Sequence, residues 1–226
     1  MKRTPLKETI FMGKVTAGLA HELKNILAII KESAGLMGDF LAMSEGRFFP
    51  HQERFSRSLI RINDQVDRGV DLATRLGLFA HATDEPVASI DLQTLRDQAA
   101  YLSHRFARSM GVTVKTEVAE KPIIVVTEPL RAQMMLFECI DLLINLESKG
   151  RHIQIVPAES SDHGISLRLV YEDDSTEKTV LLNSAAADRW SALQETALSL
   201  NVTIEFSSSP TGLLLHFARE LDSQTA

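Results

Sequence analysis

The chain has 226 residues, of which 44% are hydrophobic, and it carries a formal net charge of -6. This length and composition suit one large or two small globular domains with a real core, and they exclude the disordered and fibrous classes. The acidic balance argues against a nucleic-acid partner, because phosphate binding requires clustered Lys and Arg.

No segment suggests a membrane span, an export signal or a metal site. No stretch approaches the ~18 uninterrupted apolar residues of a transmembrane helix, and the basic start MKRTPLKE is not followed by the apolar region of a signal peptide. We therefore expect a cytoplasmic protein without a membrane partner. The single cysteine, Cys139, cannot form an internal disulfide and is predicted to be an inert core residue. The seven histidines lack a paired ligand spacing, so no metal is predicted.

The segment GLAHELKNILAII, residues 18–30, predicts a helix with apolar residues on one side and His21 on the other. At about 100° per residue, His21 lies roughly 180° from the centre of the apolar arc. The arc contains Leu19, Leu23, Ile26, Ile30, Met37 and Leu41. The neighbours of His21 on the exposed face are Ala17, Gly18, Asn25 and Ala28. These mostly small neighbours leave room for a second protein to bring a reactive group to the imidazole.

Three polar side chains share this part of the helix. The neutral imidazole of His21 has a free nitrogen lone pair that can attack phosphorus and later release the phosphoryl group. The Glu22 carboxylate can orient the ring or accept its proton, and Asn25, four residues along, lies beside His21 on the helix surface. The alternative interpretation is an ordinary solvated helix face, on which His21, Glu22 and Asn25 are only surface residues.

The run HELKNI, residues 21–26, resembles the H-box of the dimerisation and histidine-phosphotransfer domain of two-component histidine kinases. That pattern is His, Asp or Glu, two variable residues, then Asn or Thr, usually followed by Pro. Ile26 stands in place of Pro, which leaves the helix unkinked and removes no reactive group. The resemblance implies that His21 exchanges phosphoryl groups with aspartates of response-regulator receiver domains. It also implies that Asn25 positions a water molecule in a phosphatase role.

The N-terminal segment is basic although the protein is acidic. Residues 1–31 contain Lys2, Arg3, Lys7, Lys14, Lys24 and Lys31 against Glu8 and Glu22. Lys14 and Lys24 flank the histidine face, and a partner with an acidic pocket, which the family's receiver domains have, would be steered towards such a patch. A solvated helix face explains the same lysines.

A second amphipathic run follows the connection SEGRFFPH, in which Gly46 and Pro50 punctuate the chain. Its apolar residues recur at steps of three and four: Phe55, Leu59, Ile62, Val66, Val70, Ala73 and Leu76. Two long helices joined by a short connection predict an antiparallel hairpin in residues 1–82. Because a hairpin alone leaves apolar surface exposed, two copies are expected to pair into a four-helix bundle, which makes the protein a homodimer. The alternative is that the helices pack against the C-terminal domain of their own chain.

The pattern changes near HATDEPVAS, and residues 87–221 show short alternating elements. Strands are predicted at 89–92, 112–118, 122–127, 152–158, 165–172, 178–183, 202–208 and 212–218, and helices at 93–109, 129–147 and 185–200. This order predicts an α/β sandwich, a sheet covered by helices, and the fold class of the whole chain is therefore α+β. The C-terminal pattern resembles the Bergerat-type ATP-binding domain of histidine kinases.

The second resemblance implies a nucleotide site on the helix at 129–147, where the family has an Asn box that helps to hold Mg²⁺ and the phosphates. The best match is DLLINL, residues 141–146, in which Asp141 and Asn145 share one helix face and form the candidate cofactor-binding pair. The alternative is that Asn145 only faces solvent near the helix end. Such a site needs a glycine-rich turn, so that the backbone can approach the nucleotide closely. The sequence lacks this turn: DDSTEK follows the predicted strand, and no glycine lies between Gly164 and Gly212.

These features predict a phosphoacceptor helix joined to a degenerate nucleotide domain, a plan similar to the dimeric histidine phosphotransferases of two-component phosphorelays. We expect His21 to carry a phosphoryl group to or from receiver-domain aspartates, with no cofactor and without ATP-dependent autokinase activity. Two alternatives are open. The chain is either a sensor histidine kinase that binds ATP and Mg²⁺ through an unconventional site at Asp141 and Asn145, or a non-catalytic pseudokinase scaffold.

Overall fold

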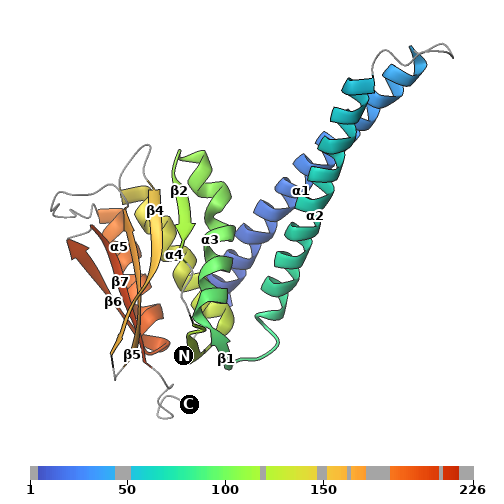
Figure 1. The fold of residues 1–226 in the computed structure, drawn as a ribbon. Helices are drawn as coiled ribbons and strands as arrows, with labels where there is room; N and C mark the ends of the chain where they lie inside the picture. The colour runs from blue at the N-terminus through green and yellow to red at the C-terminus, as the bar shows by residue number, and fades with distance from the viewer. Residues whose placement is uncertain are drawn as a thin grey trace. The chain divides into compact units, whose positions relative to one another are not determined.

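The computed structural model describes residues 5–43, 52–117, 121–146, 152–161, 164–171, 184–208 and 211–218. The chain divides into two compact units, Met1–Ala80 and His81–Ala226, and each is described by itself. In the described parts of the chain, no helix has the length and apolar character needed to cross a membrane. Two long helices followed by a mixed unit of helices and sheet confirm the predicted α+β class (Figure 1).

The first unit is a hairpin of two long helices, α1 (Pro5–Ala42) and α2 (Gln52–His81). The helices run antiparallel, because early residues of α1 meet late residues of α2. The rings of Phe11 and Phe79 meet edge to face with centroids 5.7 Å apart, and the Arg54 guanidinium lies 6.0 Å from the centroid of the Phe40 ring near the opposite end. The two predicted helices are therefore confirmed as a hairpin.

The apolar arc predicted for the first helix is only partly covered within the hairpin. Leu19 and Ile26 are buried, as is Leu72 of α2, whereas Leu23 and Leu41 are exposed. A single partner helix covers one side of α1, and the predicted arc is wider than that side. The exposure of Leu23 and Leu41 agrees with the expectation that a hairpin alone leaves part of its apolar surface uncovered.

The second unit is built on a five-stranded sheet. Its strands lie in the order β2 (Thr113–Thr116), β4 (His152–Ser161), β5 (Gly164–Tyr171), β7 (Thr211–Ala218) and β6 (Val202–Ser208). The β2 and β4 strands pair in parallel, and the other neighbours pair antiparallel. A separate two-stranded ribbon joins β1 (Ala88–Asp91) to β3 (Ile124–Thr127).

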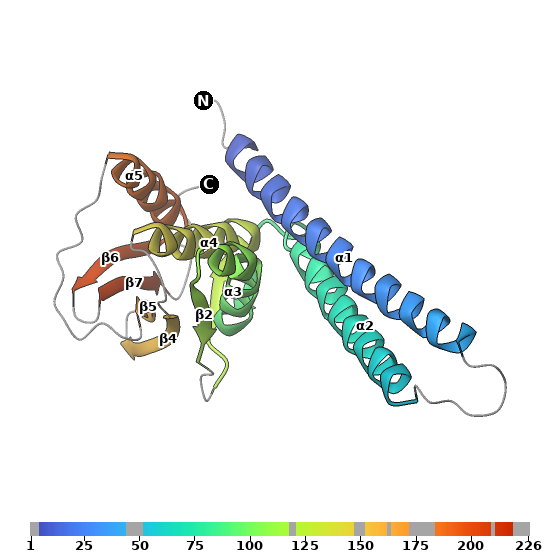
Figure 2. The same cartoon turned by 90° about the horizontal axis from the view of Figure 1, so that it is seen from above.

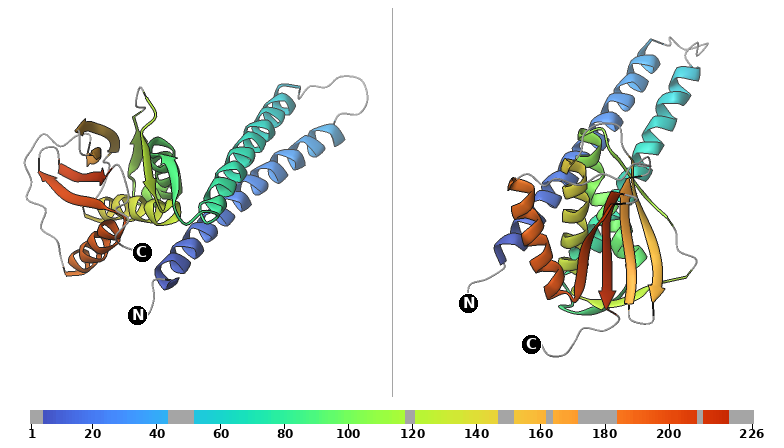
Figure 3. Two further views of the ribbon diagram at one scale, coloured as in Figure 1. Left: turned by 90° about the horizontal axis from the view of Figure 1, so that it is seen from below. Right: turned by 90° about the vertical axis from the view of Figure 1, so that its left-hand side faces the viewer.

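Three helices cover one face of the five-stranded sheet: α3 (Leu92–Ser109), α4 (Pro129–Leu146) and α5 (Ser184–Ser199), as Figures 2 and 3 show. Alternate strand residues such as Ile155, Leu167 and Leu215 are buried and belong to one core cluster with the helices, as the period of two in a strand requires. The core confirms the predicted sandwich of one sheet and one helical layer.

The start of α3 is fixed by its capping residue. Asp91 accepts hydrogen bonds on Oδ1 from the backbone N–H of Gln93 at 3.1 Å and of Ile123 at 3.0 Å. The same carboxylate therefore caps the helix and ties it to the chain that enters β3. The other predicted elements of this unit match observed ones within a few residues, except the strand predicted at 178–183, which lies outside the described residues.

Candidate phosphoacceptor site

His21 lies on α1 with its side chain exposed to solvent, as does Asn25 one turn further along. The amide Nδ2 of Asn25 lies 3.3 Å from Nδ1 of His21, which is a hydrogen-bonding distance. The contact follows from the helix itself, because residues four apart are neighbours on its surface. Because Asn25 lies against Nδ1, Nε2 is the ring nitrogen left open to a partner.

The outer face of α1 around His21 combines small and basic side chains. Lys14, Ala17, Lys24, Ala28 and Lys31 are all exposed. At about 100° per residue, these positions lie within one broad strip that includes His21. A macromolecular partner can therefore approach the imidazole closely, and an acidic one is attracted to the strip.

Glu22 differs from its two neighbours because it turns towards α2. Its Oε1 lies 3.3 Å from Nη2 of Arg68, and the Glu22 side chain is only 30% exposed. Nη1 of the same guanidinium donates to Oε1 of Gln65 at 3.2 Å. The structure thus brings His21 and Asn25 into contact, turns Glu22 towards α2, and adds Arg68 to the site. No local pattern marks Arg68, because it meets Glu22 only through the hairpin.

The second predicted pair lies on α4, in the other unit. Arg189 of α5 donates to the Asp141 carboxylate in a close ion pair. The amide nitrogen of Asn145 donates to the backbone oxygen of Asp141 at 2.6 Å, so its side chain bonds back onto its own helix. At the other end of the same two helices, Arg131 donates to Ser199 Oγ at 2.7 Å. One carboxylate oxygen of Asp141 and the amide nitrogen of Asn145 are therefore engaged in internal contacts.

The arrangement of Asp141 fits a helix-to-helix contact better than a cation site. A carboxylate that binds Mg²⁺ must present its oxygens to the ion, whereas one Asp141 oxygen already accepts a guanidinium. No group of three or more acidic, histidine or cysteine side chains suited to a metal occurs among the described residues. The resembled ATP-binding domains would have a glycine-rich turn at the position of DDSTEK, which contains no glycine. This segment lies outside the described residues.

Cys139 on α4 is completely enclosed in the core of the second unit. Burial raises the pKa of its thiol far above the ordinary value, because the thiolate loses its hydration, and the nearby Glu138 carboxylate acts in the same direction. The side chain is therefore an unreactive part of the core, as predicted.

Comparisons with known proteins give structural likenesses only. No protein-family model and no curated protein matches the chain. Among solved structures, it is similar to the histidine kinase AdeS of Acinetobacter baumannii, with 15% identity, a TM-score of 0.47, and coverage of 88% of this chain and 98% of that one. A histidine kinase from Burkholderia phymatum has 10% identity and a TM-score of 0.45, covering 90% and 98%. A bacterial phosphotransferase also has 10% identity and a TM-score of 0.45, covering 96% and 98%.

The solved structures that the chain resembles are thus histidine kinases and a phosphotransferase. At identities of 10% to 15%, these likenesses concern the fold alone.

Proposed function

We propose that the protein is a histidine phosphotransfer protein of a two-component phosphorelay, with His21 as the phosphoacceptor. The observation that carries this proposal is the exposed imidazole on the outer face of α1, with the Asn25 amide 3.3 Å from Nδ1. Glu22 and Asn25 are the other two residues of the proposed site. Response-regulator receiver domains are the proposed partners, because their aspartyl phosphates supply and accept the group that His21 carries.

The transfer needs one nucleophile and one leaving group at phosphorus. A lone pair on Nε2 of His21 attacks the aspartyl phosphate, the N–P bond forms, and the P–O bond to the aspartate breaks. The aspartate leaves as a carboxylate. For this attack Nδ1 carries the ring proton, and the Asn25 amide turns its oxygen towards Nδ1 to accept a hydrogen bond. In the return step a receiver carboxylate attacks phosphorus and the imidazole leaves.

The contacts of Asp141 support a relay over an ATP-dependent kinase. Its carboxylate is paired with Arg189, and the Asn145 side chain bonds to the Asp141 backbone. A nucleotide or Mg²⁺ would have to displace Arg189 to use that carboxylate oxygen, and a ligand would have to break the hydrogen bond to use the Asn145 amide nitrogen. We therefore propose that the phosphoryl group comes from another protein, and that no cofactor takes part.

The surface of the hairpin supports the homodimer. Leu23, Leu27 and Leu41 form an exposed apolar stripe on α1, and Leu59, Val66 and Val70 form one on α2. Each stripe lies roughly 90–130° round its helix from the side that faces the other helix. Because the helices are antiparallel, both stripes project to the same side of the hairpin, which we call the dimer face. His21 projects to the opposite side, so pairing of two dimer faces leaves the imidazole accessible.

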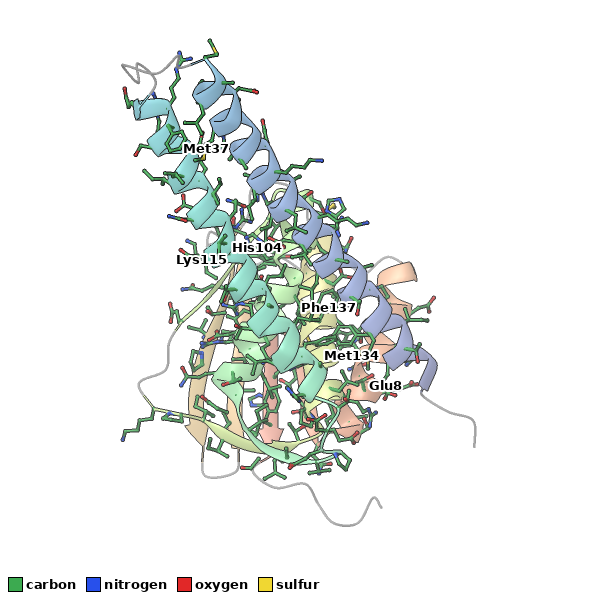
Figure 4. The ribbon with its side chains drawn as sticks, turned by 90° about the vertical axis from the view of Figure 1, so that its right-hand side faces the viewer. Glu8, Met37, His104, Lys115, Met134 and Phe137 are labelled. Atoms are coloured by element: carbon green, nitrogen blue, oxygen red, sulfur yellow. The ribbon has the colours of Figure 1, made fainter. Side chains whose placement is uncertain are left out.

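The direct test is transfer of labelled phosphate from phosphorylated receiver domains of the same organism. We expect label on the wild-type protein and none on His21→Ala. His104→Ala is the matched control, because His104 on α3 is also an exposed histidine (Figure 4). No label on the wild type, or equal label on His21→Ala, would contradict the proposal. ATP-dependent labelling of His21 that is lost in Asn145→Ala would instead establish a kinase, and unchanged signalling in cells with His21→Ala would favour a scaffold.

A further inference from the structure

The ion pair between Arg68 and Glu22 is formed in preference to an ion pair with the nearby carboxylates of α2. Arg68 has Asp64 four residues before it and Asp71 three residues after it on α2, positions at which helical ion pairs commonly form. Its guanidinium nevertheless reaches across the hairpin to Glu22 at 3.3 Å. The Asp71 carboxylate accepts from Arg75 instead, at 2.9 Å. The packing of the hairpin therefore assigns the charge of Arg68 to the residue next to the phosphoacceptor.

A bare carboxylate at Glu22 would oppose the proposed chemistry. Glu22 directly follows His21 in α1, and the group that His21 must receive is an anion of charge about -2. Like charges at such short range repel each other by an amount that grows as the site excludes water. A cation held against Glu22 cancels this repulsion. Arg68 also turns the carboxylate towards α2, away from the path of the incoming phosphorus.

From this geometry we infer that Arg68 is a positioning residue for phosphoryl transfer, which neutralises Glu22 and turns it away from the reacting face of His21. The inference rests on the proposed function, since it assigns a role within the same site. Arg68 acts through Glu22 and makes no contact with the phosphoryl group. Gln65, which accepts from the other guanidinium nitrogen at 3.2 Å, fixes the plane of the Arg68 head group.

The inference predicts a specific dependence between two substitutions. Arg68→Gln should slow phosphorylation of His21 by about tenfold, the effect of roughly one unit charge near the reacting group. The double variant Glu22→Gln with Arg68→Gln should differ in rate from Glu22→Gln alone by less than about twofold. Without the Glu22 carboxylate there is no negative charge for Arg68 to cancel. Arg68→Lys should restore most of the rate. Arg75→Gln is the matched control, since Arg75 lies two turns along the same face of α2 and pairs with Asp71.

Two donors separate this inference from the proposed function. One is a phosphorylated receiver domain, and the other is phosphoramidate, a small anionic donor from which ammonia leaves as the N–P bond to His21 forms. Suppose that the receiver gives no transfer, but that with phosphoramidate Arg68→Gln slows phosphorylation only when Glu22 is present. The relay proposal then fails and the inference stands. If Arg68→Gln matches the wild type with both donors, the inference is overturned.

The double variant decides between Arg68 acting through Glu22 and Arg68 acting directly. If Glu22→Gln with Arg68→Gln remains about tenfold slower than Glu22→Gln alone, Arg68 contacts the phosphoryl group itself and the inference is wrong. Thermal unfolding of every variant shows whether the hairpin is intact. A loss of rate that follows loss of folded protein, and that Arg68→Lys does not rescue, would also overturn the inference.

Discussion

Replacing Leu27 by lysine tests the dimer face at its centre. Leu27 lies on the exposed stripe of α1, and 55% of the residue is accessible in the single chain. Complete burial of a leucine side chain contributes about 1.5–3 kcal/mol, so covering the exposed half contributes about 1 kcal/mol. A symmetric dimer contains this residue twice. Leu27→Lys should therefore remove about 2–3 kcal/mol of association free energy, including the cost of crowding the new ammonium group.

This loss corresponds to a dimer dissociation constant that is between about 30-fold and about 150-fold weaker. Sedimentation equilibrium or light scattering over a dilution series measures it. Leu36→Lys is the matched control, because Leu36 is an exposed leucine of the same helix, 38% accessible, and projects away from the dimer face. A monomeric mass for the wild type at micromolar concentration, or equal weakening by both variants, would contradict the proposed dimer face.

Four further predictions concern the second unit and the backbone. In a double-mutant cycle measured by urea unfolding, Arg189→Ala and Asp141→Asn should show a coupling free energy of about 0.5–1 kcal/mol. The value is small because the two side chains are 42% and 19% exposed, so solvent screens the pair. Strictly additive losses would show that the pair contributes nothing to stability. Cys139 should resist thiol reagents in the native protein and react after unfolding, since burial raises its pKa, and labelling under native conditions would mean that α4 is loosely packed. Gly212→Ala should destabilise the second unit by about 3 kcal/mol, because the new Cβ would lie 2.0 Å from the Leu169 carbonyl oxygen. Gly77→Ala has open space around it and should stabilise α2 by about 0.5–1 kcal/mol. Similar melting temperatures for the two variants would contradict this. Mg-ATP should leave the melting temperature unchanged, and a rise that depends on nucleotide concentration would show binding to the folded state.

Local sequence patterns were sufficient to predict most of the fold. The period of apolar residues predicts both long helices, and alternation predicts strands such as β4 and β5, because each pattern reflects which face of one element is covered. The sequence could not predict which residues of the apolar arc on the first helix are buried and which are exposed, because Leu23 and Ile26 belong to the same pattern. Only the position of α2 decides that Ile26 is buried and Leu23 is exposed.

The candidate site shows the same limit. Asn25 lies next to His21 because helix geometry fixes residues four apart, so that contact follows from spacing alone. Arg68 and Arg189 are different, because each pairs with a carboxylate more than forty residues away. Such pairs depend on how helices pack, and neither arginine has a distinctive local pattern. The internal pairing of Asp141 therefore appears only in the structure.

If His21 carries a phosphoryl group that originates on another protein, it must become labelled without ATP. The decisive experiment is to incubate the full chain with a phosphorylated receiver domain, without ATP, and to locate the acid-labile phosphoramidate by mass spectrometry. We expect one modified residue, His21, whose phosphoryl group returns to an unphosphorylated receiver when one is added. Phosphate on any other residue, or a His21 that stays unmodified while the receiver loses its phosphate to water, would contradict it.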